Sequence, residues 1–494
     1  MARYTLSRAV SLAVLASAKT EADHHEDLGC SILGPPTRKV RRALAWLSAR
    51  IAELGADESR RQAKQLIRAL EETPAYDALC AGKQRRKGRR LLHDAALFPS
   101  PTKTPPTVLH VRRDELAFDI PVAAHEWPEI NALFSTLAAG ATRSDLSALS
   151  KNALCKEILE ELKAARWLEP WTEPDTTSDV QYIGHNTTLI RGRDASVLVD
   201  PYFRPASQFD LPSYQPMQPR DLGRVSAVLI THSHGDHFHL GSLLQLPRET
   251  RFFVPPVRRE SIFSTDCAAR LKQLGFPNVE ALPWWDEREV GDLTVRALPF
   301  FGEQPTDEEG VHPHLRNVGS TWKVTAKHGR YAFFADAGRD VEGNMTRVCA
   351  KAGPVDVLFC GVRGFKLEPI FFGATTLGAF LIDVPQKLLT EPQQLMADGP
   401  EALDYAKRLG AQTLVPCADG GAPWYWREGM GPRYPGYPGE PVLGASRLDE
   451  NPDADPYPER LKRRRGDPKL AILRPGQNLA GKTTFPFEWP FGAL

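Results

Sequence analysis

The sequence predicts an α/β protein, in which a layered α/β sandwich over residues 176–430 follows a mainly helical N-terminal domain over residues 1–175. The length of 494 residues allows two or three domains with buried cores. Before residue 95, apolar residues recur at three- and four-residue spacing, which is typical of helices. From residue 178 onward, short β-branched runs alternate with Gly, Asp and Pro, which is typical of strands joined by turns. Residues 431–494 read as a Pro- and Arg-rich C-terminal extension.

The N-terminal third carries the clearest helical patterns. Residues 38–54 (RKVRRALAWLSARIAEL) and 59–72 (SRRQAKQLIRALEE) place charged residues between apolar ones and predict two helices. Residues 127–168 predict three short helices, the last with an apolar residue at every fourth position. This order resembles a small winged-helix-like module, and a generic helical packing domain is the alternative.

The first twenty residues allow two interpretations. Leu6, Val10 and Val14 recur at helical spacing and predict an ordinary first helix. Two arginines before a short apolar stretch, with an Ala-Ser-Ala sequence at 16–18, imitate a signal peptide. The stretch is rich in alanine and broken by serines, so we favour the helix.

Net charge, apolar runs and cysteine spacing argue against nucleic-acid binding, membrane insertion and a disulfide framework. The formal net charge of +1 gives no overall reason to expect nucleic-acid binding, and two basic runs at 83–90 and 460–465 are expected to be solvated surface. No apolar run reaches the roughly 18 residues that a membrane helix needs. The cysteines are odd in number and scattered, which favours free thiols and a cytoplasmic location. They are Cys30, Cys80, Cys155, Cys267, Cys349, Cys360 and Cys417.

The sequence THSHGDH (231–237) follows the apolar run VSAVLI (225–230), which predicts a buried strand. Loops after such strands are where α/β folds place their chemistry. His232 and His234 are two residues apart, so an extended backbone directs both to one side. Asp236 and His237 can then face a second point. Imidazole and carboxylate groups are the ligands of divalent metal ions, so this motif predicts a metal site.

This motif resembles the signature of the metallo-β-lactamase superfamily. SVLVDP (196–201) is similar to the strand, Asp and Pro that come before it in that family, and FFADAG (333–338) is similar to a later strand that ends in a bridging aspartate. The stretch LPWWDEREVGDLTVRALPF (282–300) resembles the phosphodiesterase and lactonase branch. The resemblance covers roughly residues 178–430. It implies an αβ/βα sandwich with a dinuclear metal site, in which Asp336 bridges the two ions.

Two ligand positions depart from the hydrolases of this family. Glu303, in PFFGEQP, stands where a histidine is due, with His312 and His314 as competing ligands. No histidine follows His328, so the last ligand cannot be imidazole. Asp419 is the natural substitute there, and Cys417 is a softer alternative.

These replacements change the expected metal and reaction. Two histidines with one carboxylate are associated with non-haem iron and oxygen chemistry. The layout is similar to the branch that holds the diiron β-hydroxylases of the chloramphenicol-biosynthesis type. We therefore predict an enzyme with two metal ions, iron favoured, that activates O2 with an external electron donor. It would oxidise a small or a carrier- or peptide-bound substrate. The predicted ligands are His232, His234, Asp236, His237, Glu303, Asp336 and Asp419, and the predicted catalytic residues are Asp236, Glu303 and Asp336.

Two other functions are compatible with the same residues. The first is a zinc or manganese hydrolase of phosphodiester, lactone or amide bonds, in which His312 or His314 completes the first site. The second is a binding module with a degenerate site, which the intact first motif argues against. Among further residues, His185 and His239 are possible neighbours of the ligands, and Trp424, Tyr425 and Trp426 could line a substrate pocket.

Overall fold

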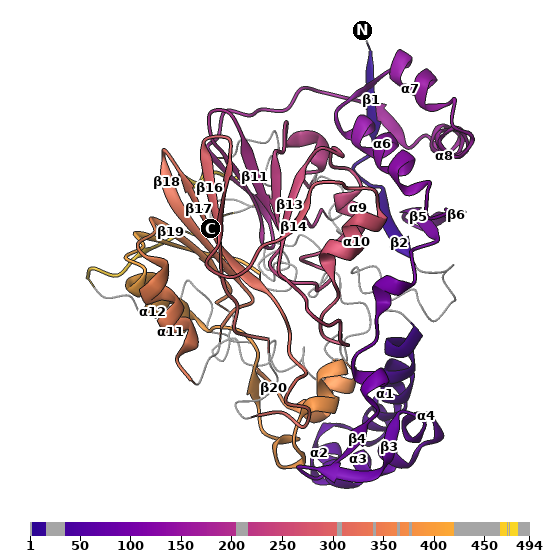
Figure 1. Ribbon diagram of the computed structural model, residues 1–494, viewed down its shortest axis with the longest axis vertical. Helices are drawn as coiled ribbons and strands as arrows, with labels where there is room; N and C mark the ends of the chain where they lie inside the picture. The colour runs from indigo at the N-terminus through magenta and orange to yellow at the C-terminus, as the bar shows by residue number, and fades with distance from the viewer. Residues whose placement is uncertain are drawn as a thin grey trace.

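The structure is a computed structural model that describes residues 2–15, 35–203, 216–303, 309–338, 342–362, 366–374, 378–418, 465–471, 473 and 475–482. Two β-sheets stand face to face at its centre, and helices cover their outer sides (Figure 1). This arrangement confirms the predicted α/β sandwich in the C-terminal part of the chain.

The first sheet has six strands in the order β14-β13-β12-β11-β10-β9. Strands β11 to β14 are parallel, and β9 and β10 form an antiparallel hairpin beside them. Because Val199 of β11 pairs with Leu229 of β12, the residues after both strands emerge at the same edge of the sheet. The strands are β9 (Val180–Gly184), β10 (Thr187–Arg191), β11 (Ser196–Val199), β12 (Ala227–Leu229), β13 (Arg251–Val254) and β14 (Val279–Ala281).

The second sheet has seven strands in the order β15-β16-β17-β18-β19-β22-β23. Helices α11 (Asn344–Ala352) and α12 (Gly399–Arg408) pack on its outer face (Figure 1). Buried side chains such as Leu229, Trp322 and Phe333 form one hydrophobic core between the two sheets. The strands are β15 (Glu287–Val290), β16 (Leu293–Pro299), β17 (Ser320–Ala326), β18 (Gly329–Ala335), β19 (Val357–Cys360), β22 (Thr413–Pro416) and β23 (Lys469–Leu470).

The N-terminal third is a mixture of strands and helices, so the prediction of a mainly helical domain is wrong. Ser11–Leu15 forms strand β2, which pairs in register with Val108–Arg112 of β5. The spacing of Leu6, Val10 and Val14 suits a helix locally, but pairing with a partner about a hundred residues away decides the conformation. The first six strands that this prediction missed are β1 (Arg3–Leu6), β2 (Ser11–Leu15), β3 (Cys80–Arg86), β4 (Arg89–Leu92), β5 (Val108–Arg113) and β6 (Leu116–Pro121).

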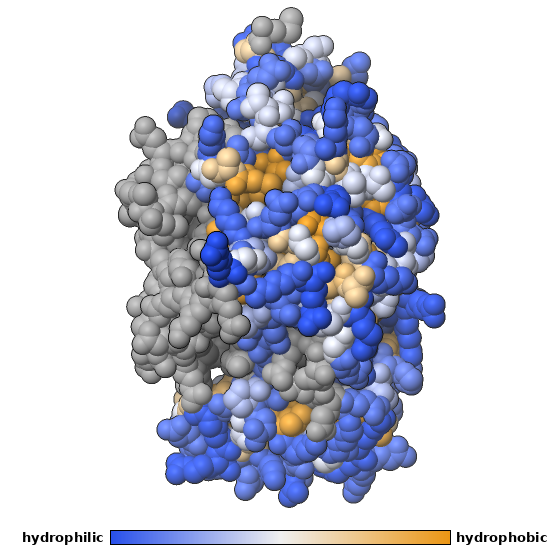
Figure 2. Space-filling view, turned by 90° about the vertical axis from the view of Figure 1, so that its left-hand side faces the viewer, coloured by the Kyte–Doolittle hydropathy of each residue, from blue (hydrophilic) through white to orange (hydrophobic). Residues whose placement is uncertain are grey.

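Residues 35–97 form a helical unit at one end of the molecule. Both predicted helices are present, although the second is divided at Gln62. The basic run at 83–90 forms the β3–β4 hairpin, and Arg89 within it is fully buried against Glu71 instead of being solvated. The face of this unit seen in Figure 2 is largely hydrophilic. Its helices are α1 (Pro35–Leu54), α2 (Ala56–Arg61), α3 (Ala63–Glu72), α4 (Pro74–Asp77) and α5 (Asp94–Leu97).

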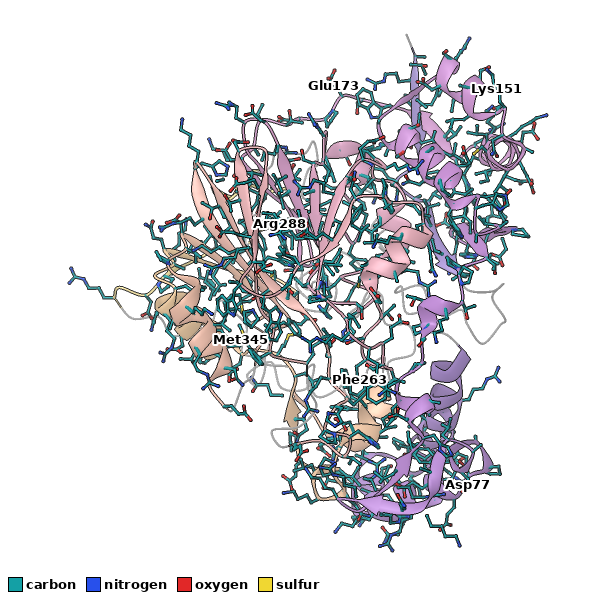
Figure 3. All side chains as sticks on the ribbon, in the orientation of Figure 1. Asp77, Lys151, Glu173, Phe263, Arg288 and Met345 are labelled. Carbon is teal, nitrogen blue, oxygen red and sulfur yellow. The ribbon has the colours of Figure 1, made fainter. Side chains whose placement is uncertain are left out.

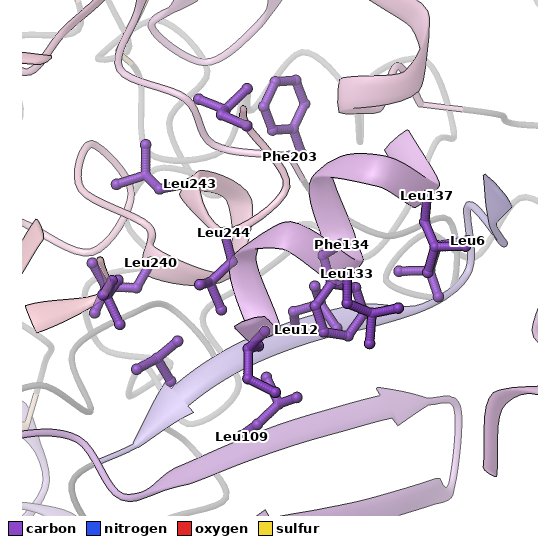
Figure 4. Packing of buried hydrophobic residues seen from close by; sticks show 14 of the residues in the cluster. Leu6, Leu12, Leu109, Leu133, Phe134, Leu137, Phe203, Leu240, Leu243 and Leu244 are labelled. Carbon is purple, nitrogen blue, oxygen red and sulfur yellow. The ribbon is translucent and has the colours of Figure 1, made fainter. Parts of the chain in front are cut away.

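A second N-terminal unit lies against the first sheet. It contains the three helices that were predicted, α6 (Trp127–Ala138), α7 (Arg143–Leu149) and α8 (Ala153–Ala164), and a small sheet in the order β7-β1-β8. Its remaining strands are β7 (Ala141–Thr142) and β8 (Leu168–Pro170). Leu12, Leu133 and Phe134 from this part of the chain pack with Leu240 and Leu244 of the sandwich (Figure 4).

Two predictions from composition can be compared with the described part of the chain. None of its helices is long and apolar enough to cross a membrane. All six cysteines that it contains are buried free thiols, while Cys30 lies outside it. The predicted domain boundaries near residues 175 and 430 stay a prediction, and most of residues 431–494 lie outside the described part.

Candidate metal centre

The first sheet supplies the histidine motif at its carboxyl edge. Strand β12 ends at Leu229, and the loop that follows places His232 and His237 in the fully buried interior. The ring of His232 stacks on Phe300, with 5.3 Å between ring centroids, and its Nδ1 lies 3.0 Å from the hydroxyl of Thr231. These contacts fix the ring so that Nε2 is directed toward the second sheet.

The second sheet supplies two carboxylates at the facing edge. Glu303 follows β16 and Asp336 follows β18. The two loops touch, because Gly302 forms a β-bridge with Ala337 and approaches the backbone so closely that an added Cβ would lie 2.6 Å from the carbonyl oxygen of Asp336. Glycine is therefore required before Glu303, and the close contact sets the positions of both carboxylates.

Four side chains form the first donor group: His232, His234, Glu303 and Asp336. Oε2 of Glu303 lies 2.8 Å from Nδ1 of His234 and 3.1 Å from Nε2 of His232. Oδ2 of Asp336 lies 3.7 Å from the same Nε2. All four donor atoms lie within 4.8 Å of one another, which is a spacing that a single metal ion can occupy.

Three side chains form the second donor group: His185, Asp236 and His237. Nε2 of His185 lies 3.3 Å from Oδ2 of Asp236 and 3.2 Å from Nε2 of His237. Oδ2 of Asp336 lies 3.2 Å from that nitrogen of His237, so Asp336 stands between the two groups.

His185 is the candidate donor that the sequence analysis undervalued. It occupies the turn of the β9–β10 hairpin, whose neighbour in the sheet is β11. Thr188 of β10 pairs with Val199 of β11, so the turn lies at the same edge as the histidine motif. The available signal was the histidine between two β-branched strands in IGHNTT, but its distance to the motif depends on strand order.

Asp200 holds the second group from behind. Its side chain is fully buried, and its Oδ2 lies 2.7 Å from Nδ1 of His237. The same carboxylate accepts hydrogen bonds from the backbone N–H of Thr231 at 2.7 Å and from Nδ2 of Asn186 at 2.6 Å. A carboxylate on the far nitrogen of a ligating histidine fixes its tautomer and raises its basicity.

The donor atoms fit a metal ion better than they fit one another. Among the described residues, Nε2 of His232 and Oδ1 of Asp336 are buried and make no hydrogen bond. A buried polar atom without a partner destabilises the fold by about 1–3 kcal/mol, and a bound cation removes that cost. Nitrogen and carboxylate donors that converge in this way suit a first-row transition metal.

The pKa shifts of the donor residues show that the centre attracts positive charge. Burial disfavours the charged form of His237, yet the carboxylates of Asp336 and Asp236 raise its pKa well above the ordinary value. Burial likewise opposes ionisation of Glu303, but His234 and His232 lower the pKa of its carboxyl group. Burial and the neighbouring His237 lower the pKa of His232. A metal cation would take the place of these protons.

Backbone strain gathers around the same residues. Nine non-glycine residues in the described part of the chain have positive φ, and five of them are at the centre or directly beside it. Strained backbone of this kind is found preferentially at functional sites, where the surrounding structure holds it in place. The five are His185 (φ 54°), Asp200 (φ 38°), Glu303 (φ 48°), Ala335 (φ 49°) and Ala418 (φ 52°).

The other residues considered for the site belong to neither donor group or lie outside the described residues. His239 accepts a hydrogen bond from the backbone N–H of Ser242 and so caps α9 (Leu240–Leu243). His312 is buried beside Asp383 and, like His314, belongs to neither donor group. The Sγ of Cys417 lies 3.2 Å from Oδ1 of Asn186. Asp419, Trp424, Tyr425 and Trp426 lie outside the described residues.

Comparison with known proteins agrees with this architecture. Residues 179–418 match the family model of the β-lactamase superfamily domain. This part of the chain belongs to the metallo-β-lactamase superfamily.

Three individual similarities extend beyond that domain. The chain is 26% identical over 360 residues to the 4-amino-L-phenylalanyl-[CmlP-peptidyl-carrier-protein] 3-hydroxylase of Streptomyces venezuelae, and the match covers 69% of this chain and 62% of that protein. It is also similar to the crystal structure of CmlA, a diiron β-hydroxylase from the same species, with a TM-score of 0.53, 18% identity and coverage of 85% of this chain and 90% of the other. A mutant of CmlA gives a TM-score of 0.54 at 17% identity and covers 96% and 99% of the two chains.

Proposed function

We propose that this protein is a dinuclear non-haem iron oxygenase that hydroxylates an amino acid carried on a protein or peptide. The observation that carries the proposal is the position of Glu303, whose carboxylate lies 2.8 Å from His234 and 3.1 Å from His232. Two histidines and one carboxylate on one metal are typical of oxygen-activating iron. The hydrolases that this chain resembles have a histidine at the position of Glu303.

Each donor would have a defined role in holding the metal pair. His232, His234 and Glu303 would hold the first iron, and Asp336 would lie between the two. His237 and Asp236 would hold the second, and the proximity of His185 supports its addition to this set. Asp419 stays a proposed ligand of the second iron. When bound, the iron pair supplies the activation of O2 after reduction by an external donor.

The chain also supplies groups that orient these donors. Asp200 holds His237 through Nδ1, and Asn317 donates from Nδ2 to Oε2 of Glu303 at 2.8 Å. Partners of this kind typically change metal affinity or activity by about 10–100-fold. The carboxylate of Asp200 also adds negative charge beside the centre, which favours the higher oxidation states of iron.

An apolar wall next to the centre supports the exclusion of water during oxidation. Phe380 lies in the short helix η7 (Gly378–Asp383), and its ring lies 6.2 Å from that of His234 and 4.4 Å from that of Phe263. Phe263 lies toward the helical unit 35–97 in Figure 3. That unit shares one buried core with η7 and with Phe263, which supports a role as a cap over the centre.

The substrate class rests on the relative. The name of the Streptomyces hydroxylase describes an aminophenylalanyl group attached to a peptidyl carrier protein. We propose a substrate of the same class here, an amino acid attached to a carrier or a peptide. One oxygen atom of O2 would enter the C–H bond as the new hydroxyl group. The second would leave as water, formed with two electrons from the external donor and two protons from solvent.

The first experiment is to measure metal content and an optical spectrum on freshly purified protein. We expect one iron for each of the two donor groups, and an absorption band that changes on reduction and on exposure to oxygen. Zinc in both positions, with turnover that is indifferent to oxygen and reductant, would support the hydrolase alternative instead.

Substitutions of Glu303 test the observation that carries the proposal. Glu303→Ala is expected to abolish oxygenation, because the first metal loses its carboxylate. Glu303→His restores a donor of the hydrolase type and is expected to retain metal while oxygen-dependent turnover is lost. The readouts are metal content and oxygen consumption for both variants, and full oxygenation by Glu303→Ala would overturn the proposal.

A further inference from the structure

The small sheet of the second N-terminal unit has an open edge at β8. Ser7 N–H donates to the carbonyl of Trp167 at 2.8 Å, and Trp171 N–H donates to that of Arg3 at 3.0 Å. In an antiparallel ladder, bonded and non-bonded pairs alternate, so the Leu6–Leu168 pair between them is non-bonded. The N–H and C=O of Leu168 therefore point away from β1. No strand in the described part of the chain pairs with that side of β8.

A groove of about 620 Å³ adjoins this edge, and Leu168 forms part of its wall. Arg143 from the start of α7, Lys163 from the end of α8 and Arg166 beyond it also line the groove. All three cationic side chains are exposed, and none forms an ion pair with a described residue. The lining contains no acidic residue, so the groove is a positively charged concave surface without internal neutralisation.

These two features together define the chemistry of a ligand. The free N–H and C=O of Leu168 suit an extended main chain, which can add to a sheet as a further strand. The cationic side chains around the groove suit carboxylate side chains on that strand. Tyr4 and Ser147 add a ring and a hydroxyl to the lining.

Nucleic acid is a poorer match for the same unit. Helix α8 is the last of the three helices, and it would be the one to enter a DNA groove if this unit acted as a winged-helix-like module. Its exposed residues include Glu157, Glu160 and Glu161, and these carboxylates would repel a phosphate backbone. The cationic residues Lys163 and Arg166 lie in the last turn of α8 and just beyond it, where they line the groove beside β8.

We propose that the groove between α7, α8 and β8 binds an acidic peptide segment, which adds to the free edge of β8 as a fourth strand. The site belongs to the N-terminal unit and is built from residues that take no part in the metal centre. It would tether a peptide-linked partner to the enzyme, and its existence does not depend on which reaction the metals perform.

The test is a binding experiment on the full-length protein with an array of immobilised peptides of roughly ten residues, enough for one strand. The peptides share a β-branched framework and differ in the number of Glu or Lys residues. We expect binding that increases with the number of Glu residues and decreases with salt. Peptides N-methylated at every residue have no N–H to donate to a strand edge, and they are expected to lose this binding.

A matched pair of variants locates the site. Reversal of the groove charges, in R143E/K163E/R166E, is expected to weaken binding at least tenfold. Reversal of three exposed charges on the helical unit, in K64E/R68E/K83E, is expected to leave it unchanged. The proposal would be overturned if no acidic peptide binds, or if binding does not depend on the number of Glu residues. It would also be overturned if binding persists after N-methylation of the peptide or in the groove variant. Preference for a single-stranded oligonucleotide over these peptides would do the same.

The binding readout separates this proposal from the proposed function. Peptide binding that depends on the groove can be present in a protein that proves to contain zinc and not iron. Conversely, if the protein is an iron oxygenase but does not bind acidic peptides, the proposed function stands and the peptide site is refuted.

Discussion

The two donor groups of the metal centre are built in different ways. The first draws two histidines from the loop after β12 and two carboxylates from loops after β16 and β18, so it joins the two sheets. The second draws all three of its described donors from the first sheet, through the β9–β10 turn and the loop after β12. Asp336 links them, since its Oδ2 lies 3.7 Å from His232 and 3.2 Å from His237.

This difference has a consequence for stability. A metal ion in the first group ties the edges of both sheets together, so its binding energy contributes directly to the stability of the sandwich. A metal ion in the second group is held by one sheet and stabilises mainly its own loops. Chelation is therefore expected to lower the melting temperature mostly when the first ion leaves.

Asp336→Ala is expected to have the largest effect, because this side chain contacts both groups. Metal content should fall below one ion per chain, and activity should fall by more than the roughly 100-fold seen when an outer partner of a metal ligand is lost. Elemental analysis after dialysis measures the first effect. Asp398→Ala is the control, since that aspartate caps α12 and its loss should cost about 1 kcal/mol without loss of metal. Two tightly held ions in Asp336→Ala would contradict the linking role.

His185→Ala is expected to have an intermediate effect that is limited to the second group. Metal content should fall toward one ion per chain, while the ion tied to both sheets remains and preserves most of the melting temperature. His239→Ala is the matched control, because His239 is also buried but caps α9. Loss of this cap should lower the free energy of unfolding by about 1 kcal/mol and leave the metal content unchanged. If His185→Ala keeps the full metal content, His185 is a neighbour and not a ligand.

Asn317→Leu is expected to have the smallest effect and to act on the first group alone. The substitution removes the hydrogen bond of 2.8 Å to Glu303 without changing a donor of the metal. Affinity for the first ion should fall about 10–100-fold, and affinity for the second should not change. Titration with a competing chelator resolves the two ions. An equal loss of both would show that Asn317 supports the whole centre.

The sandwich part of the chain and the residue types of its candidate metal centre were predictable because short sequence segments carry the evidence for them. The strand before THSHGDH, the carboxylates after FFADA and PFFGE, and the superfamily itself follow from short segments. The structure brings His232, His234, Asp236, His237, Glu303 and Asp336 into two adjacent groups. The N-terminal third was predicted less well, since β2 and β5 become strands only by pairing with a partner about a hundred residues away.

The sequence by itself determined the residue types of the metal centre and the alternation of strands and turns that carries them, because both depend on neighbours within a few positions. Only the tertiary structure decided how these pieces meet. It placed His185 beside His237, which are 52 residues apart, because β9 and β10 continue the sheet next to β11. It buried Arg89 of a basic run against Glu71, and it left the edge of β8 open beside three cations. Strand order, register and the burial of charge are properties of the whole chain, and local patterns do not encode them.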